Sequence, residues 1–345
     1  MQEKDYLWFK EAKYGLMIHF GLYSMLEGQY KGQKAGRYSE WIQSKYQIPK
    51  IEMEELAKNF NPIYFNADEI VKFAKDMGMK YLVLTTKHHE GFCLFNSKVD
   101  DFNSYKMSIC HRDFVKEISD ACHRQSMKLG FYYSQDLDWH ERHGGGYLSH
   151  YKENNPWWND GTTFDNSWDF KREEGKDFDI YFRQKVLPQV KELMTNYGEI
   201  STVWFDVPAT INIAQSTELR DLVKKYQPNC LINSRIGNGL YDYIALEDNE
   251  VPDDISSSVT FQDALKLKGN NPYGLFESAC TLNDTWGFSY FDNKYKSVEE
   301  ICNIKNKLNR QGINFLINVG PDHLGRISPE SIQILKDIKK LTRNK

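Results

Sequence analysis

Short apolar runs recur eight times along the chain, and most are followed by a stretch with the three-to-four-residue spacing of an amphipathic helix. The apolar runs cover residues 14–20, 81–88, 129–134, 200–206, 230–235, 243–247, 273–280 and 313–319. The helical stretches cover residues 67–77, 114–126, 178–196, 216–226, 297–310 and 328–342. Strands that alternate with helices predict βαβ units and a parallel sheet. Eight such units predict an α/β fold, a (β/α)8-like TIM barrel.

Polar residues at the ends of these stretches support the predicted boundaries. Asn66 stands where a helix N-cap is expected, and Gly78 follows the last periodic residue of the same helix. Residues 236–242 leave no room for a helix between the fifth and sixth strands, so we expect a distorted barrel that lacks one helix there. Since no repeat or Pro/Ser-rich linker divides the chain, we expect residues 1–345 to form a single domain.

Composition and charge limit the classes of partner and the location that we expect for this protein. The formal net charge is -4 and the basic residues are scattered, so no nucleic acid is expected as a partner. The chain begins without a secretory signal and has no long apolar run, which predicts no membrane span and a cytoplasmic protein, or a secreted or periplasmic one if a leader has been removed. Six cysteines without a C-x-x-C pair argue against a zinc site or a disulfide framework. A homo-oligomer stays open.

Polar side chains stand at or near the ends of the predicted strands. In chain order they are His19, His88, His89, Tyr133, Gln135, Asp206, Arg235, Glu247, Glu277 and Asn318. Since the loops at the carboxyl end of a TIM barrel build its active site, these residues predict one site. Adjacent strand residues point to opposite faces, so His88 and His89 are poor co-ligands of a metal. We expect no metal and no cofactor.

Asp206 ends an apolar run and is costly to bury unless it has a partner or a chemical role. Two carboxylates with different roles fit glycoside hydrolysis, in which one attacks the anomeric carbon and the other protonates the leaving oxygen. We expect Asp206 to be the nucleophile and Glu247 the acid/base. Glu277 is the runner-up for the acid/base, and Glu40 and Asp248 are more distant alternatives.

Aromatic residues make up 14% of the chain, and many lie in the polar stretch 147–170 without a regular period. Rings in loops suit a ligand with apolar faces and hydroxyl edges, such as a sugar. We expect this stretch to shape the subsites for the leaving group. The alternative is a loop that packs on itself.

The chain resembles the α-L-fucosidases of glycoside hydrolase family 29 over nearly its whole length. The motifs that carry the resemblance, in the family's order, are residues 8–24 (WFKEAKYGLMIHFGLYS), 39–41 (SEW), 87–95 (KHHEGFCLF), 131–134 (FYYS), 203–206 (VWFD), 232–235 (INSR), 276–288 (FESACTLNDTWGF) and 314–321 (NFLINVGP). Several motifs in one order are a strong signal, whereas any one alone is weak.

The resemblance implies a retaining mechanism with Asp206 as the nucleophile, and its nearest match to the acid/base is Glu247. It also implies that the substrate is bound by His19, Glu40, Trp41, His88, His89, Tyr133, Trp204, Arg235 and Trp286. Among these, Arg235 lies near the nucleophile and Trp286 forms part of the wall for the methyl group of fucose. The implied substrate is a fucosylated oligosaccharide or glycoconjugate.

The chain departs from the family's pattern beside the expected catalytic residues. Val207-Pro208 replaces the usual Gly after the nucleophile, Ser234 replaces Asp before the arginine, and Ala245-Leu246 replaces Thr-Pro before the acid/base. Phe20 stands where Trp is common, and the chain ends at Lys345, where the family commonly continues into a β-sandwich. We therefore expect only the catalytic barrel.

The sequence thus predicts a retaining exo-α-L-fucosidase that releases terminal α-L-fucosyl residues from glycans or glycosides. Two alternatives stay open: an α-L-galactosidase-like enzyme, and a fucose-binding protein without catalysis on a degenerate barrel.

Overall fold

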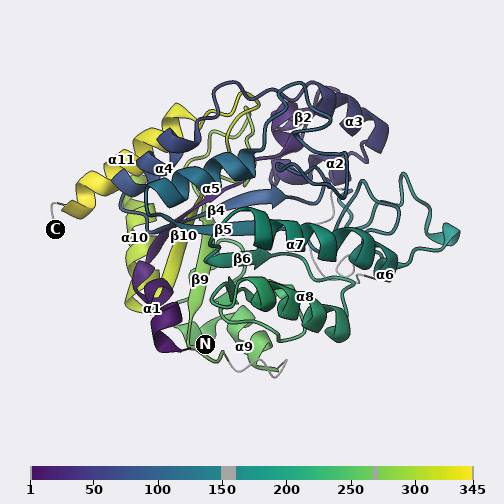
Figure 1. The fold of residues 1–345 in the computed structure, drawn as a ribbon. Coiled ribbons are helices and arrows are strands. Elements are labelled where there is room, and N and C mark those ends of the chain that lie inside the picture. The colour runs from purple at the N-terminus through teal and green to yellow at the C-terminus, as the bar shows by residue number, and fades with distance from the viewer. Residues whose placement is uncertain (1, 149–160, 267–270, 344–345) are drawn as a thin grey trace.

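The computed structural model describes residues 2–148, 161–266 and 271–343, and it contains a curled sheet of eight parallel strands (Figure 1). These strands are β1 (Tyr14–Ile18), β4 (Tyr81–Lys87), β5 (Lys128–Tyr133), β6 (Thr202–Phe205), β7 (Leu231–Ile232), β8 (Ile244–Ala245), β9 (Phe276–Thr281) and β10 (Ile313–Val319). Their order in the sheet is β7-β6-β5-β4-β1-β10-β9-β8. Each strand lies within or close to one predicted run, and the predicted α/β barrel class is confirmed.

The two edge strands meet through very little backbone pairing. One parallel bridge joins Asn233 to Tyr243, just beyond β7 and just before β8. The N–H groups of Asp242 and Tyr243 both donate to the carbonyl oxygen of Ile232, at 2.8 and 3.2 Å. The sheet therefore closes into a barrel along a short seam.

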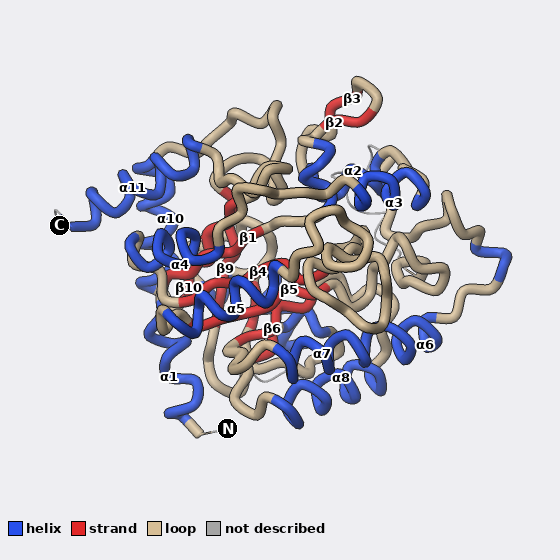
Figure 2. Tube along the Cα trace, turned by 45° about the horizontal axis from the view of Figure 1, so that its top comes forward, coloured by secondary structure: helices blue, strands red, loops and turns tan. Residues whose placement is uncertain are grey.

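Helices cover the outside of the sheet (Figures 1 and 2). They are α1 (Glu3–Ala12), α2 (Ile42–Lys45), α3 (Lys50–Lys58), α4 (Ala67–Asp76), α5 (Phe114–Arg124), α6 (Phe178–Tyr181), α7 (Leu187–Asn196), α8 (Ile213–Tyr226), α9 (Val259–Lys266), α10 (Val298–Arg310) and α11 (Pro329–Arg343). A π-helical turn, Phe182–Val186, joins α6 to α7 within the single helix predicted over 178–196. A two-stranded ribbon, β2 (Gln29–Tyr30) and β3 (Gln33–Lys34), stands apart from the barrel sheet.

Between β7 and β8 the chain makes only a 3₁₀ turn, Ser234–Ile236, so the predicted absence of a helix there is confirmed. Helix boundaries also follow the predicted signals. The Asn66 side chain accepts from the N–H of Glu69 at the start of α4, and Gly78 takes φ +87° just after it. The periodic pattern did not predict α1, α2, α3 and α9. Among the described residues, no helix is both long and apolar enough to span a membrane.

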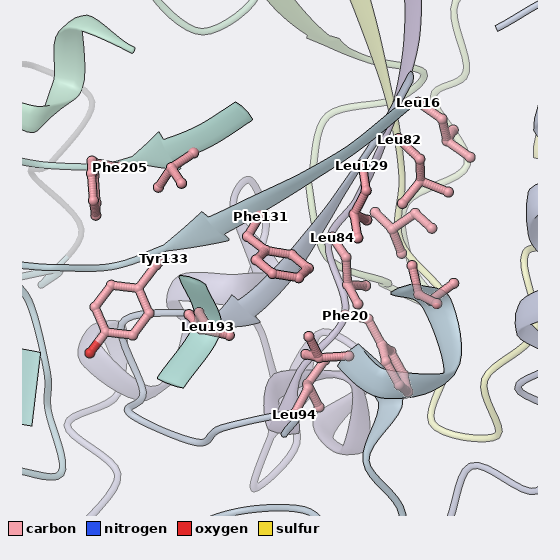
Figure 3. Packing of buried hydrophobic residues seen from close by; sticks show 14 of the residues in the cluster. Leu16, Phe20, Leu82, Leu84, Leu94, Leu129, Phe131, Tyr133, Leu193 and Phe205 are labelled. Carbon is pink, nitrogen blue, oxygen red and sulfur yellow. The ribbon is translucent and has the colours of Figure 1, made fainter. Parts of the chain in front are cut away.

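The strands divide their side chains between two apolar layers. Leu16, Leu82 and Phe131 face outward and pack with the helices, as Figure 3 shows for part of this layer. Their neighbours Met17, Val83 and Tyr132 belong to the inner cluster, inside the barrel. Since alternate residues of a strand point to opposite sides, a shift of one residue decides whether a side chain can reach the site.

Candidate active site

Asp206 follows the last residue of β6, and three contacts hold it in place. Its Oδ2 accepts from the Tyr132 hydroxyl at 2.8 Å, and its Oδ1 accepts from Arg235 Nη1 at 2.8 Å. Its backbone N–H donates to Gln135 Oε1 at 2.8 Å. The carboxylate is nearly buried, but these hydrogen bonds offset the free-energy cost of burying a charged group.

Arg235 joins Asp206 to a second carboxylate. Its Nη2 donates to Asp248 Oδ1 at 2.8 Å and to the carbonyl oxygen of Leu246 at 3.0 Å. The guanidinium carbon lies 4.6 Å from the centre of the Trp204 ring, within the range of a cation–π contact. The Arg235 guanidinium therefore bridges the carboxylates of Asp206 and Asp248. Arg235 reaches both because it lies on the short turn between β7 and β8.

Glu247, the acid/base expected from the sequence, is exposed at the rim of the barrel. Its backbone N–H donates to Glu250 Oε2 and Thr260 Oγ1, at 2.9 and 3.0 Å. The Arg235 charge lowers the pKa of Glu247, but desolvation and the neighbouring carboxylates, Asp248 foremost, outweigh it and raise that pKa above its ordinary value. This raised pKa is a shift in the direction that a general acid needs.

Three imidazoles lie side by side across from these carboxylates. The ring centres of His88 and His89 are 4.1 Å apart, and those of His19 and His88 are 5.8 Å apart. Burial lowers the pKa of His19 to about 3 and holds the pKa of His89 well below its ordinary value. His19 and His89 are therefore neutral, as suits hydrogen bonding to hydroxyl groups.

Glu40, Trp41 and Trp286, which the resemblance named as substrate contacts, lie beside these imidazoles. Glu40 is buried, and its Oε2 accepts from the backbone N–H groups of Trp286 and Gly287 at 3.2 and 2.9 Å. Burial raises the pKa of Glu40. The Trp286 ring lies 5.1 Å from that of His19, and the Trp41 ring lies 4.7 Å from that of His89.

Tyr133 does not lie in this site. It lies in the outer apolar layer (Figure 3). Its hydroxyl donates to Gln189 Oε1 on α7 at 2.8 Å. Tyr132 takes its place, with its hydroxyl on Asp206 and its ring stacked on His88 and Trp204. Tyr132 shares the barrel interior with Met17 and Val83, but no signal in the sequence alone separates it from Tyr133.

Glu277 also lies elsewhere than expected. It is the second residue of β9, not a residue at its end, and its side chain is buried inside the barrel. Its carboxyl accepts from the Tyr81 hydroxyl at 2.6 Å and from Trp204 Nε1 at 2.9 Å. Trp204 in turn lies beneath Arg235 and Tyr132, so Glu277 supports the floor of the site.

Burial raises the pKa of Glu277 to about 7 from an ordinary 4.5. Between these values the folded chain binds more protons than the unfolded one, so this group makes the free energy of unfolding fall as pH rises, by about 3 kcal/mol in all. Glu277→Gln removes this pH-dependent contribution to the free energy of unfolding. We expect the variant to gain stability relative to wild type between pH 5 and pH 8. Urea unfolding of both proteins at the two values checks this, and a constant difference between them would contradict it.

Val207, next to Asp206, has φ +45°, a left-handed conformation that β-branched residues rarely adopt. This is the position where the family usually has Gly, which takes such a conformation without strain. Val207 thus places a strained residue beside Asp206.

A buried ion network lies behind the histidines. Lys87, the residue before His88, is fully buried, and its Nζ lies 3.0 Å from Asp138 Oδ2. Lys185 Nζ lies 3.2 Å from the same oxygen. Burial alone would raise the pKa of Asp138, but Lys185 and Lys87 lower it below its ordinary value. The N–H of Trp139, the next residue, donates to the carbonyl oxygen of His89 at 2.8 Å, so the network fixes the backbone of the site.

Asp100, His140 and Glu141 place potential metal ligands within 4.8 Å of one another. Lys185 Nζ lies 2.5 Å from Asp100 Oδ2 and 3.1 Å from Glu141 Oε1. An ammonium group thus already neutralises this acidic cluster.

The aromatic stretch 147–170 lies partly outside the described residues, including Trp157 and Trp158. Its described end packs beside the site. Trp139 Nε1 donates to the carbonyl oxygen of Phe164 at 2.9 Å, and Phe164 and Trp139 share a cluster with Trp41.

Paired carboxylates at the carboxyl end of a barrel, facing neutral imidazoles and indole rings, define the class of glycoside hydrolases. The chain belongs to the α-L-fucosidase family, whose model matches residues 2–344.

Similar proteins have been solved and curated. The α-L-fucosidase AlfC from Lactobacillus casei, solved with α-L-fucose product, is 50% identical, with a TM-score of 0.89 over 99% of this chain and 98% of its own. A mutant of AlfC with Fucα(1,6)GlcNAc is 49% identical, with a TM-score of 0.88 over 98% of both chains. Bovine tissue α-L-fucosidase is 33% identical over 140 residues, 38% of this chain and 29% of that protein. The match thus spans less than a third of the length of that curated relative.

Proposed function

We propose that this protein is a retaining exo-α-L-fucosidase that hydrolyses terminal α-L-fucosyl residues by double displacement. The proposal rests on the contacts of the Asp206 carboxylate. One of its oxygens accepts a hydrogen bond from Tyr132 and the other accepts one from Arg235, which also donates to Asp248. Two carboxylates bridged by one guanidinium suit the roughly 5–5.5 Å separation of a retaining pair. Asp206 attacks the anomeric carbon, and the leaving oxygen takes a proton from the second group.

Two adjacent residues compete for the role of acid/base. Glu247 has the raised pKa, and Asp248 has the direct contact with the guanidinium that holds the nucleophile. Reach is the first requirement for proton transfer, and pKa is the second. We therefore assign Asp248 first and keep Glu247, the choice from sequence, as the competitor.

Asp248→Asn and Glu247→Gln are the variants that separate them. We expect Asp248→Asn to lose about 10²–10⁴-fold in kcat/KM on a fucosyl disaccharide, whose leaving group needs a proton. It should lose much less on 4-nitrophenyl α-L-fucoside, and added azide should give α-L-fucosyl azide. Glu247→Gln should lose less than tenfold on either substrate. The reverse pattern assigns the acid/base to Glu247.

The substrate class follows from the wall of imidazoles and from the relatives. AlfC, about half identical, was solved with Fucα(1,6)GlcNAc, so this linkage is the first to test. An apolar wall at Trp286 discriminates only about 10²-fold against an extra hydroxyl, so weak hydrolysis of α-L-galactosides is also expected.

The test of the proposed function is release of nitrophenol from the α-L-fucoside, with the α-L-galactoside, β-D-galactoside and β-D-glucoside as comparisons. Turnover confined to the α-L sugars supports it. A folded protein that binds fucose but hydrolyses none of these sugars would favour the fucose-binding alternative.

A further inference from the structure

Each imidazole of the site has a neighbour at Nδ1, and those neighbours decide where the ring proton lies. A neutral imidazole carries one N–H and one bare nitrogen, which accepts but cannot donate. The face that His19, His88 and His89 present to a sugar therefore depends on groups that the sugar does not touch.

For His19 the deciding group is Asn318, on β10. The Asn318 Nδ2 donates to the carbonyl oxygen of Trp286 at 2.7 Å, which fixes the amide orientation. Its Oδ1 then faces His19 Nδ1 at 2.7 Å and can only accept. The proton of His19 is therefore on Nδ1, and Nε2 is bare.

For His89 the deciding group is Ser134, just after β5. The Ser134 hydroxyl donates its one proton to the carbonyl oxygen of Leu137 at 2.8 Å. Its oxygen must then accept from His89 Nδ1, at 2.7 Å. The bare Nε2 of His89 is buried without a hydrogen-bond partner among the described residues, 3.8 Å from Asp206 Oδ2. Two acceptors that face each other at this distance leave a place for a donor.

For His88 the deciding group is Glu90. Its Oε1 accepts from the N–H of Leu22 at 3.1 Å, and its Oε2 lies 3.6 Å from His88 Nδ1. This distance exceeds that of a hydrogen bond, and both atoms are buried without a hydrogen-bond partner among the described residues. Since Asp206 Oδ2 already accepts from Tyr132 whereas Glu90 Oε2 has no donor, a proton on His88 Nδ1 gives the Glu90 oxygen its nearest donor.

We propose that His19, His88 and His89 are all held as Nδ1–H tautomers, so that the site presents three bare Nε2 acceptors and binds a sugar through hydroxyls that donate. Asn318, Glu90 and Ser134 are positioning residues that set this polarity. The inference rests on the proposed function for the identity of the sugar, but the tautomers are properties of the chain itself.

The tautomers are measured directly by ¹⁵N NMR of the unliganded protein labelled at histidine, since a protonated and a bare ring nitrogen resonate far apart. The variants His19→Gln, His88→Gln and His89→Gln assign the three rings. We expect Nδ1–H for all three. A proton on Nε2 in any of them overturns the proposal, whatever the enzyme hydrolyses.

The polarity also predicts which sugar analogues bind. Fluorine accepts weakly but cannot donate, so it should not replace a hydroxyl that faces a bare nitrogen. By calorimetry we expect monodeoxy analogues of L-fucose, altered at C2, C3 or C4, to bind about 10–100-fold more weakly than fucose. The fluorinated analogues should bind no better than their deoxy counterparts. Fluorine that restores affinity at two or more of these carbons overturns the proposal, whereas a failure of L-fucose itself to bind rejects the proposed function instead.

Ser134→Ala tests a positioning residue, with Ser108→Ala as the matched control. Both remove a buried serine hydroxyl, but Ser108 Oγ makes no hydrogen bond within the described part of the chain. We expect Ser134→Ala to convert the His89 signals to a mixture of tautomers and to weaken fucose binding about tenfold. Ser108→Ala should change neither. An unchanged His89 tautomer in Ser134→Ala removes Ser134 from the proposal.

Discussion

Asp206→Ala is expected to lose about 10³-fold or more in turnover of an aryl α-L-fucoside, at least ~4 kcal/mol of transition-state stabilisation. The physical reason is that, in the proposed mechanism, the carboxylate forms the bond to the anomeric carbon, and no other described group is held in the same position. Tyr132 and Arg235 remain in the variant and leave a polar hole where the carboxylate was. Azide that enters this hole should attack from the same side and give β-L-fucosyl azide.

The product of azide rescue is the sharper measurement, because many substitutions reduce a rate. β-L-Fucosyl azide from Asp206→Ala and α-L-fucosyl azide from the acid/base variant would together define a retaining pair. The fold of Asp206→Ala is checked by its unfolding midpoint. Turnover near the wild-type rate in a folded Asp206→Ala would exclude Asp206 as the nucleophile.

Asp138→Ala is expected to have the largest effect on stability. The change removes a fully buried carboxylate and leaves the Lys87 and Lys185 ammonium groups facing each other without it. Removal of one partner of a buried ion pair typically costs about 3–5 kcal/mol. Urea unfolding at pH 7 measures this loss. Activity should fall as well, since Trp139 anchors the His89 backbone from the next position.

The matched control for this prediction is Asp120→Ala. Asp120 pairs with Lys116 one helical turn away on the surface of α5, where both side chains are exposed. Exposed pairs of this kind contribute at most about 0.5 kcal/mol. Equal losses in the two variants would show that the buried network is not what stabilises this part of the fold.

The sequence predicted the barrel because its signals are local. Each strand is an apolar run that can be recognised without knowing its neighbours, and the short segment after β7 has too few residues to form a helix. That several candidate residues lie close together was also predicted: Asp206, Arg235 and the three histidines come together where strand ends meet.

What the sequence could not supply is the side to which a side chain points near a strand end. Tyr132 and Tyr133 are chemically identical neighbours, and only the pairing of β5 with β4 and β6 decides which one faces Asp206. Likewise, the apolar run expected over 273–280 did not show that Glu277 is the second residue of β9, with its side chain buried inside the barrel. The contact between Arg235 and Asp248 could not be predicted from the sequence either, because it depends on the path of two irregular turns.

The seam between β7 and β8 gives the molecule a preferred line of local opening. Those strands have two residues each and share one bridge, whereas β4 and β5 pair along their length. Amide protons of Asp242 and Tyr243 should therefore exchange with solvent faster than those of Leu82 and Leu84. Arg235 follows β7 and Asp248 follows β8, so an opening of this seam would separate the two sides of their contact. A bound sugar that bridges the two sides should slow the exchange.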